Sequence, residues 1–588
     1  MLHLQYLGGP RERPAGHELG LSLMNSTDHR VISTGVSLSA ICLAYFYALD
    51  RILFSSAHFS AIFRMLLTIY DLRTAWLALA ICCLAALWNR PAPILRLVDC
   101  FGKYPYYVAA VCVAMMALGT IVVYHDYPFS MDEYAAVFQS KIFADGRLFA
   151  QLPRDLIDWL VVRGFNGSFL VASPETGRAI EHYWPGFALL LAPFEFFRVP
   201  WLCNASLAGL ALVLIHRITK EITGDRRAAG WALLFTVASG AFAADALSYY
   251  SMQAHLTANL LFVALLLEPS RYRAFCAGLT GSLALILHNP IPHVLFAIPW
   301  IVALTAERDQ RGYLPPLILG YLPGAAIGLG WLVFRSDIGS GAHGLSAVHG
   351  VAEGVFAWPD AVLLNMRAAA LVKMCLWAPP CLFVFVFLGR LARRDSRHVR
   401  LLMQSGCLTF TGYLFVQFDQ GHGWGYRYFH SAWGAVPILA ACGLIARSDT
   451  QQRLISFAGA AAILNLIVVV PFQMCQINEI ISQHLAQLPA PKRPGNNIYF
   501  IHPRGGFYVA DMVQIDPALR DRDLLLVSRG TQLDEQLIRL NWPDAVEVAS
   551  GRAADQWYLG AQDRRQPMAG EENQRHFVVT SAGIAQLR

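Results

Sequence analysis

The chain has 588 residues, of which 56% are hydrophobic and only 15% charged, and its mean hydropathy is +0.42. This composition excludes an ordinary soluble protein, because many separate apolar segments approach the length that a bilayer demands. The formal net charge of +6 at pH 7 is spread over loops that the positive-inside rule assigns to the cytoplasm. It therefore gives no indication of nucleic-acid binding.

Apolar segments follow one another along most of the chain, which predicts an all-α polytopic membrane protein with about 13 transmembrane helices. The predicted helices are 32–54, 72–88, 106–124, 201–216, 228–246, 253–267, 274–288, 292–305, 313–334, 365–388, 400–418, 431–446 and 454–472. A further apolar segment, 184–197, contains Pro185 and Pro193. It is expected to be either re-entrant or the start of a kinked helix.

Basic residues set the orientation of this membrane domain, residues 32–472. They gather before the first and the third predicted helix, at Arg11, Arg13, Arg30, Arg90, Arg96 and Lys103. The positive-inside rule then places residues 1–31 in the cytoplasm and the long loop 125–183 on the outer side. We expect the membrane to be a bacterial inner membrane, with the loop on its periplasmic or extracellular face.

Beyond residue 472 the apolar pattern ends, and residues 473–588 are expected to form a small extracytoplasmic α/β domain. Two short apolar runs, 497–501 and 523–527, predict buried strands, and the pattern of 533–540 predicts a helix.

An acidic pair, Asp132 and Glu133, lies a few residues beyond the third predicted helix and opens an amphipathic run. Carboxylates held where a helix leaves the membrane favour chemistry at the lipid interface over transport, which would place ionisable groups near the midplane. A structural alternative exists for Glu133. Ser130 and Glu133 have the spacing of a capping box, which would hold Asp132 in place without requiring chemistry from Glu133.

Further polar residues gather on the outer face, and some are candidates to bind a donor or substrate. These candidates are Arg427, Tyr428, His288, His182, Lys373 and His422. Arg427 lies in an aromatic, glycine-rich turn, where a guanidinium can hold a phosphate through two hydrogen bonds. The alternatives are an interfacial Arg stacked on aromatic rings, a snorkelling Lys373 and histidines that only cap helices.

Two motifs follow the third predicted helix. The first is the acidic pair followed by Ala135-x-x-Phe138-x-x-x-Ile142 and then by Asp145-Gly146-Arg147-Leu148, and the second is the proline-containing element 183–193. Both resemble motifs of the GT-C glycosyltransferases, in particular the bacterial relatives of protein O-mannosyltransferases and the lipid A aminoarabinose transferases, although the second has one proline where that family often has two adjacent ones. The resemblance covers about residues 100–470, so the C-terminal domain lies outside it and the acceptor stays open.

The resemblance implies an inverting transfer of a sugar from a polyprenyl-phosphate donor to a hydroxyl of a cell-envelope glycan, lipid or protein. Asp132 would be the general base. A divalent metal stays an open alternative, with Asp132, Glu133, His182, His288 and His422 as ligands, although their spacing matches no metal motif. Residues 335–350 could form a mobile lid. The competing functions are a carrier or flippase for a lipid-linked sugar and a noncatalytic membrane scaffold.

Overall fold

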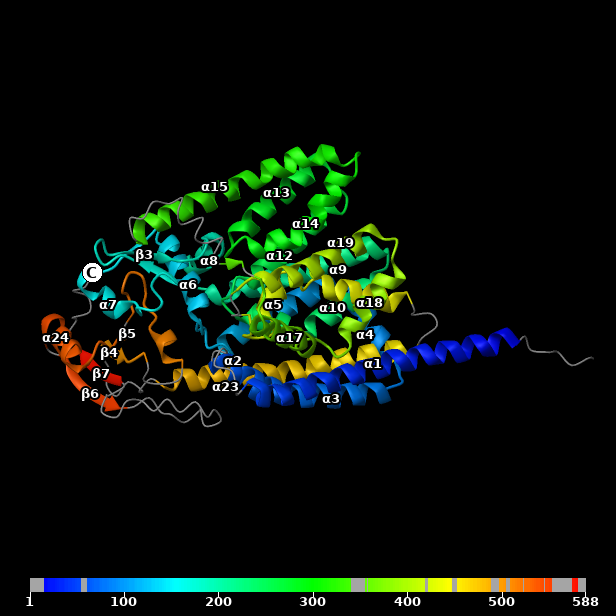
Figure 1. Cartoon of the computed structure of the whole chain (residues 1–588), viewed down its shortest axis with the longest axis horizontal. Coiled ribbons are helices and arrows are strands. Elements are labelled where there is room, and N and C mark those ends of the chain that lie inside the picture. The colour runs from blue at the N-terminus through cyan, green and yellow to red at the C-terminus, as the bar shows by residue number, and fades with distance from the viewer. Residues whose placement is uncertain are drawn as a thin grey trace, which may run out of the picture.

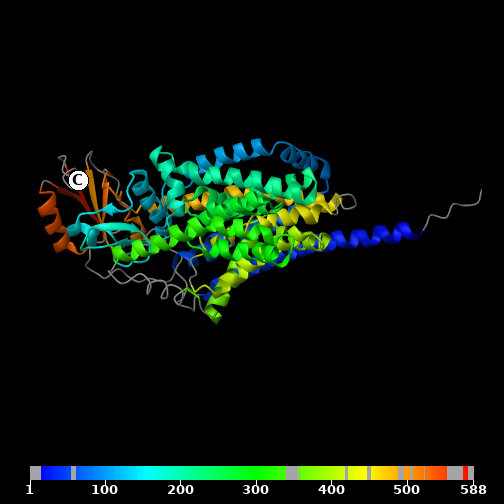
Figure 2. The same cartoon turned by 90° about the horizontal axis from the view of Figure 1, so that it is seen from above.

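The computed structural model describes residues 15–53, 61–339, 355–356, 358–417, 421–446, 452–487, 496–503, 508–521, 523–543, 545–551 and 574–579. These residues are mostly helical. The helices form one elongated bundle, with a small region of β-structure at one end and the long helix α1 (Ala15–Leu53) extending beyond the other (Figure 1, Figure 2). Most of the predicted lid, residues 340–350, lies outside the described residues.

The bundle consists of α1 and helices that follow in chain order. They are α2 (Ala61–Met65), α3 (Leu72–Leu87), α4 (Pro91–Lys103), α5 (Pro105–Val122), α8 (Gly186–Phe196), α9 (Cys203–Thr223), α10 (Arg226–Val237), α11 (Gly240–Leu247), α12 (Met252–Leu266), α13 (Arg271–Ile286), α14 (Ile291–Ala306), α15 (Leu314–Gly339), α17 (Ala361–Leu376), α18 (Leu382–Ala392), α19 (Arg397–Gly412), α20 (Arg427–His430), α21 (Ala435–Ile445), α22 (Gln452–Leu464) and α23 (Val470–Leu485). Two π-helical segments, η1 (Leu66–Asp71) and η6 (Asn465–Val469), join α2 to α3 and α22 to α23.

Close contact between α13 and α15 depends on small residues, as is common between helices in membranes. A Cβ atom on Gly278 would lie 2.1 Å from the backbone oxygen of Leu317, and one on Gly320 would lie 2.4 Å from that of Phe275. Any larger side chain at either position would push these helices apart.

Six helical segments of the described residues are long and apolar enough to cross a membrane, and a seventh results if the bent pair α10 and α11 is one span. The six are Asp28–Leu49, Ile62–Leu87, Pro105–Val122, Pro200–Thr223, Arg311–Gly339 and Gln452–Leu485. A multi-pass helical membrane protein is thereby confirmed, whereas the predicted 13 crossings are not. Several other predicted spans coincide with apolar helices that are shorter than the about 20 residues of a full crossing, such as α12 with 15 residues and α21 with 11.

The loop 125–183 has a fold of its own. It contains α6 (Met131–Ala144), α7 (Ile157–Leu160) and a three-stranded antiparallel sheet, whose first strand lies between the two helices. Its strands are β1 (Ala150–Gln151), β2 (Leu170–Ala172) and β3 (Arg178–Glu181), in the order β1-β3-β2.

The described C-terminal residues form a mixed sheet of four strands in the order β5-β4-β7-β6. The strands are β4 (Asn496–Ile501), β5 (Asp523–Val527), β6 (Val546–Gly551) and β7 (Gln574–Val579), and α24 (Thr531–Asn541) follows β5. β4 pairs in parallel with β5 and antiparallel with β7. The two predicted strands coincide with β4 and β5. By contrast, α23 continues to Leu485, past the predicted end of the membrane domain at residue 472.

The C-terminal sheet and the outer loop share a single hydrophobic core. Tyr134 and Phe138 of α6 belong to the same buried cluster as Phe500 of β4, Leu526 of β5 and Trp542 after α24. Since burial of apolar side chains is the main favourable term in folding, the two regions stabilise each other. The C-terminal region is therefore packed directly against the helix that carries the acidic pair.

Candidate active site

The first turn of α6 carries both acidic residues, and the predicted capping box is present there. The backbone N–H of Ser130 donates to Glu133 Oε2 at 3.1 Å. Glu133 is fully buried, and its Oε1 accepts the backbone N–H of Tyr249 at 2.9 Å. Glu133 thus closes the helix start and ties it to the turn before α12, which is a structural role.

Asp132 points the other way and contacts two side chains from distant parts of the chain. Its Oδ2 lies 3.3 Å from both terminal nitrogens of Arg427. Its Oδ1 accepts a hydrogen bond from the Tyr183 hydroxyl. The Asp132 side chain is 13% exposed and that of Arg427 is 5% exposed, so this ion pair is largely removed from water.

Arg427 is held in place from several sides. Its backbone N–H donates to Gly421 O at 3.0 Å, and its guanidinium lies over the Tyr250 ring, 4.0 Å from the centroid. A Cβ atom on Gly423 would lie 3.2 Å from Arg427 Nε, so the Arg427 side chain packs closely against this glycine. The stacking leaves the planar guanidinium able to bind an anion in its own plane.

His288 and Tyr183 add an aromatic wall to this site, whereas His182 lies beside it. The rings of Tyr183 and His288 are 3.9 Å apart between centroids. His182 accepts a hydrogen bond from Arg335 at its backbone oxygen. Burial lowers the pKa of His182 and of His288 to about 4, so both imidazoles are neutral at pH 7.

The other three predicted residues lie in a neighbouring cluster. Lys373 is buried, with its Nζ 2.8 Å from Asp71 Oδ2 and 2.9 Å from the backbone oxygen of His422. His422 is buried against the ring of Phe63. Tyr428 stacks on Tyr413, with ring centroids 4.7 Å apart. The structure therefore brings Asp132, Arg427 and His288 together and joins Lys373 to His422, whereas Tyr428 lies against Tyr413 and Tyr426.

Sequence reasoning missed several residues of the site. Tyr183 and Tyr250 touch the ion pair, and both stood among aromatic residues at predicted outer helix ends, which was a usable signal. Asp511 and Tyr508 of the C-terminal region also reach the start of α6, and nothing in their local sequence marks them. Among the described residues, no group of three or more His, Cys, Asp and Glu side chains is arranged to hold a metal ion.

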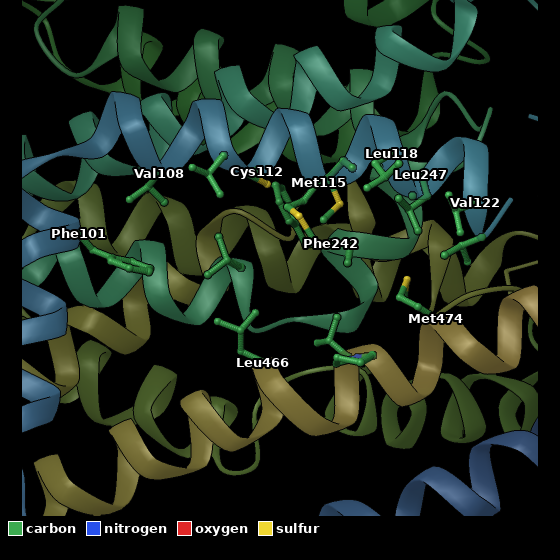
Figure 3. Close-up of a pocket in the computed structure, with 18 of the residues that line it drawn as sticks. Phe101, Val108, Cys112, Met115, Leu118, Val122, Phe242, Leu247, Leu466 and Met474 are labelled. Carbon is green, nitrogen blue, oxygen red and sulfur yellow. The ribbon is translucent and has the colours of Figure 1, made fainter.

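An apolar cavity of about 1060 Å³ lies between α5, α11 and α23. Figure 3 shows side chains from both sides pointing into it, including Met115 of α5, Leu247 of α11 and Leu466 of the segment before α23. The end of the cavity nearest the turn after α5 is lined by Val122 and Asn478. The cavity is long, almost wholly apolar and suited to a hydrocarbon chain.

This end of the cavity lies next to the turn that leads to the acidic pair. His125, in the turn after α5, lies 2.8 Å from Asn478 Oδ1 through its Nε2 and 2.9 Å from Ser482 Oγ. His125 and Asp126 both have left-handed backbones, with φ of 59° and 50°, so the chain reverses sharply before α6. An amphiphile in the cavity would have its head near this turn.

We expect Lys373→Met to lower the free energy of unfolding by about 3–5 kcal/mol, because it leaves the buried carboxylate of Asp71 unpaired. The double variant Lys373→Met, Asp71→Leu should recover much of this loss, since it removes both charges. Thermal unfolding in detergent measures both effects. If Lys373→Met instead weakened the affinity for the donor at unchanged stability, Lys373 would be a donor-binding residue.

The pH dependence of stability should report on Glu133. Burial raises the pKa of Glu133 from 4.5 to about 7, although hydrogen bonds from Tyr249 and Ser130 oppose the shift. Between these pH values the unfolded chain releases a proton that the folded protein keeps. The free energy of unfolding therefore falls as the pH rises, by at most about 1.4 kcal/mol per pH unit from this group.

Glu133→Gln should show a shallower fall in unfolding free energy between pH 4.5 and pH 7 than the wild type. Burial also raises the pKa of Asp511 to about 7, and that contribution is common to both proteins. The difference between the two slopes, measured by denaturant unfolding in detergent, isolates Glu133. Identical slopes would mean that Glu133 is ionised in the folded protein at pH 5.

No protein-family model and no curated protein matches the chain. Two solved structures of ArnT from Cupriavidus metallidurans are similar to it at 13% identity. The one bound to undecaprenyl phosphate covers 80% of this chain and 98% of its own, with a TM-score of 0.48. The apo structure covers 81% and 98%, with a TM-score of 0.46.

An Archaeoglobus fulgidus oligosaccharyltransferase in complex with zinc and sulfate is also similar at 13% identity, over 65% of this chain and 56% of its own, with a TM-score of 0.34. All three TM-scores lie below 0.5, so the chemistry of the site rests on its own residues.

Proposed function

We propose that the chain is an inverting membrane glycosyltransferase that moves a sugar from a polyprenyl-phosphate donor to an acceptor hydroxyl on the outer face of a bacterial inner membrane. The observation that carries this proposal is the desolvated pair of Asp132 and Arg427 at the start of α6. It provides one carboxylate and one cation in contact, which is the minimum that such a transfer needs.

In the proposed reaction the donor phosphate takes the place of Asp132 on the Arg427 guanidinium, which releases the carboxylate. The acceptor oxygen attacks the anomeric carbon as the bond from that carbon to the phosphate oxygen breaks. The polyprenyl phosphate leaves with the bonding electron pair, stabilised by Arg427. Asp132 takes the proton of the acceptor hydroxyl, and the sugar is transferred with inversion.

One further feature supports a lipid-linked donor. The apolar cavity along α5 would hold part of the polyprenyl chain, with the phosphate toward the turn between α5 and α6. A neutral His288 beside Tyr183 could donate a hydrogen bond to the sugar without adding charge.

Filling the cavity should weaken the use of long polyprenyl donors. We expect Met115→Trp to raise the donor KM about 10-fold, because exclusion of two methylene groups from an apolar site costs about this much. Ile121→Trp is the matched control, since Ile121 lies on the same helix, is exposed and does not line the cavity. The KM for a short-chain donor should change little in either variant, and an equal rise for both donors would contradict the assignment.

The proposed function itself is tested by mass spectrometry of surface glycolipids and glycoproteins from a deletion strain of the host bacterium. Strains that carry an empty vector, the wild-type gene or the Asp132→Asn variant are compared at matched membrane abundance. A sugar that disappears on deletion and returns only with the wild type supports catalysis and names both sugar and acceptor. Full restoration by Asp132→Asn would favour a carrier or a scaffold.

A further inference from the structure

A short segment of the C-terminal region, residues 508–515, contacts the loop and the helix turn that carry Asp132. The carboxylate of Asp511 accepts the backbone N–H of Met131 at 3.1 Å. Met131 is the first residue of α6, and its N–H is one of the donors that a helix start leaves without a partner inside the helix. A carboxylate at this end also interacts favourably with the positive end of the helix dipole.

Two more contacts fix the same turn on either side of Asp132. Gln514 Nε2 donates to the backbone oxygen of Pro128 at 2.7 Å. The backbone N–H of Ile515 donates to the Tyr134 hydroxyl at 2.8 Å, and this hydroxyl donates to Ile515 O at 2.9 Å. The 508–515 segment thus holds the chain before, at and after the helix start.

Tyr508 is the strained member of this segment. Its backbone lies in the left-handed region, with φ of 60°, which a bulky residue rarely adopts. Its ring lies 5.4 Å from that of Phe129, and its hydroxyl hydrogen-bonds the Asp511 carboxylate. Strained residues of this kind persist where the surrounding structure determines their conformation, often at functional sites.

We propose that the 508–515 segment is a positioning element of the active site, in which Asp511 fixes the first turn of α6 so that Asp132 meets Arg427 and the acceptor. This inference rests on the proposed glycosyl transfer. Asp511 bonds the residue next to Asp132 and acts through the backbone, so its removal displaces the base without removing it. Its loss should lower kcat more than it alters the donor KM, because Arg427 stays in place.

The test compares Asp511→Ala, Asp511→Asn and the wild type in full-length protein reconstituted with a polyprenyl-phosphate sugar. We expect Asp511→Ala to lower kcat about 100-fold, as a displacement of about 1 Å can do, with the donor KM within about 3-fold of the wild type. Asp511→Asn should restore most of kcat, because its amide oxygen can still accept the Met131 N–H.

Asp534→Ala is the matched control for damage to the C-terminal region. Asp534 is equally buried there, but it accepts hydrogen bonds from Trp159 Nε1 and Arg529 N and does not touch the start of α6. Its variant should keep a near wild-type kcat at matched abundance. An unchanged kcat in Asp511→Ala, or the same loss in Asp534→Ala or Asp511→Asn, would overturn the proposal.

Hydrogen exchange separates this inference from the proposed function. In Asp511→Ala the backbone amides of residues 129–134 should exchange faster than in the wild type, whereas Asp511→Asn should stay close to it. This exchange measurement tests the positioning role even if the wild-type protein transfers no sugar. A wild-type protein without transfer activity would count against the proposed function only. Unchanged exchange in Asp511→Ala would overturn the positioning role.

Discussion

Asp132→Asn is expected to reduce sugar transfer by about 100- to 10,000-fold while leaving the protein folded and inserted, because it removes the general base at almost constant volume. The variant still has an oxygen that can accept from the Tyr183 hydroxyl. Its donor KM should stay within a few-fold of the wild type, since Arg427 and the apolar cavity are intact. Initial rates with a defined polyprenyl-phosphate sugar in proteoliposomes measure both quantities.

Asp145→Asn is the matched control for this experiment. Asp145 is the C-cap of the same helix, is partly exposed and pairs with Arg147 and Arg520, far along α6 from Arg427. Its variant should transfer sugar at close to the wild-type rate. If Asp132→Asn were as active as this control, Asp132 would not be the base, and a second carboxylate near the turn would have to be sought.

The sequence singled out Asp132 and Arg427 separately but gave no sign of their contact. Both stood out because charged groups at a membrane surface are few and costly to place. Their direct contact joins positions 295 residues apart and depends on how α20 packs in the bundle, which no local pattern records. Only the structure makes these two residues one pair.

For Lys373, the same reasoning from the sequence did not anticipate its buried partner, Asp71. Its sequence surroundings indicate a cation at an outer helix end, yet the side chain is buried against Asp71 at the end of the π-helical segment η1. A π-helical turn shifts the side chains that follow it, so the 3.6-residue period could not place Asp71 in front of Lys373. Site reasoning from residue type alone cannot separate such a structural pair from a ligand-binding cation.

The helical class of the fold was predicted from the sequence, whereas the number of crossings stays a prediction. Hydropathy detects apolar stretches, but it does not give the length of the helix that each one forms, and α12 has only 15 residues. The 508–515 segment left no signal either, because its contacts to α6 are made by backbone groups and single polar side chains spaced more than 370 residues from their partners. Only the tertiary structure brings this segment to the site.

Arg427→Ala should have two separable effects, a loss of stability and a loss of donor use. Removal of the guanidinium leaves the Asp132 carboxylate unpaired in a site that is largely closed to water, and this should lower the free energy of unfolding by about 3–5 kcal/mol. Transfer should fall as well, because the leaving phosphate loses its cation, a change that typically costs about 100- to 1,000-fold in kcat. Thermal unfolding in detergent and donor titrations measure the two effects.

The double variant Arg427→Met, Asp132→Leu separates these effects, since it removes both charges and leaves none unpaired. Its stability should return toward that of the wild type, while its transfer should stay at background. Arg427→Lys should keep much of the stability but bind the donor more weakly, because an ammonium cannot form the two parallel hydrogen bonds to a phosphate or stack on Tyr250 as a guanidinium does. If Arg427→Lys kept the wild-type donor KM, a positive charge alone would be enough to bind the donor phosphate. If Arg427→Ala also kept the wild-type donor KM, the phosphate would be bound elsewhere, and Arg427 would serve only to orient Asp132.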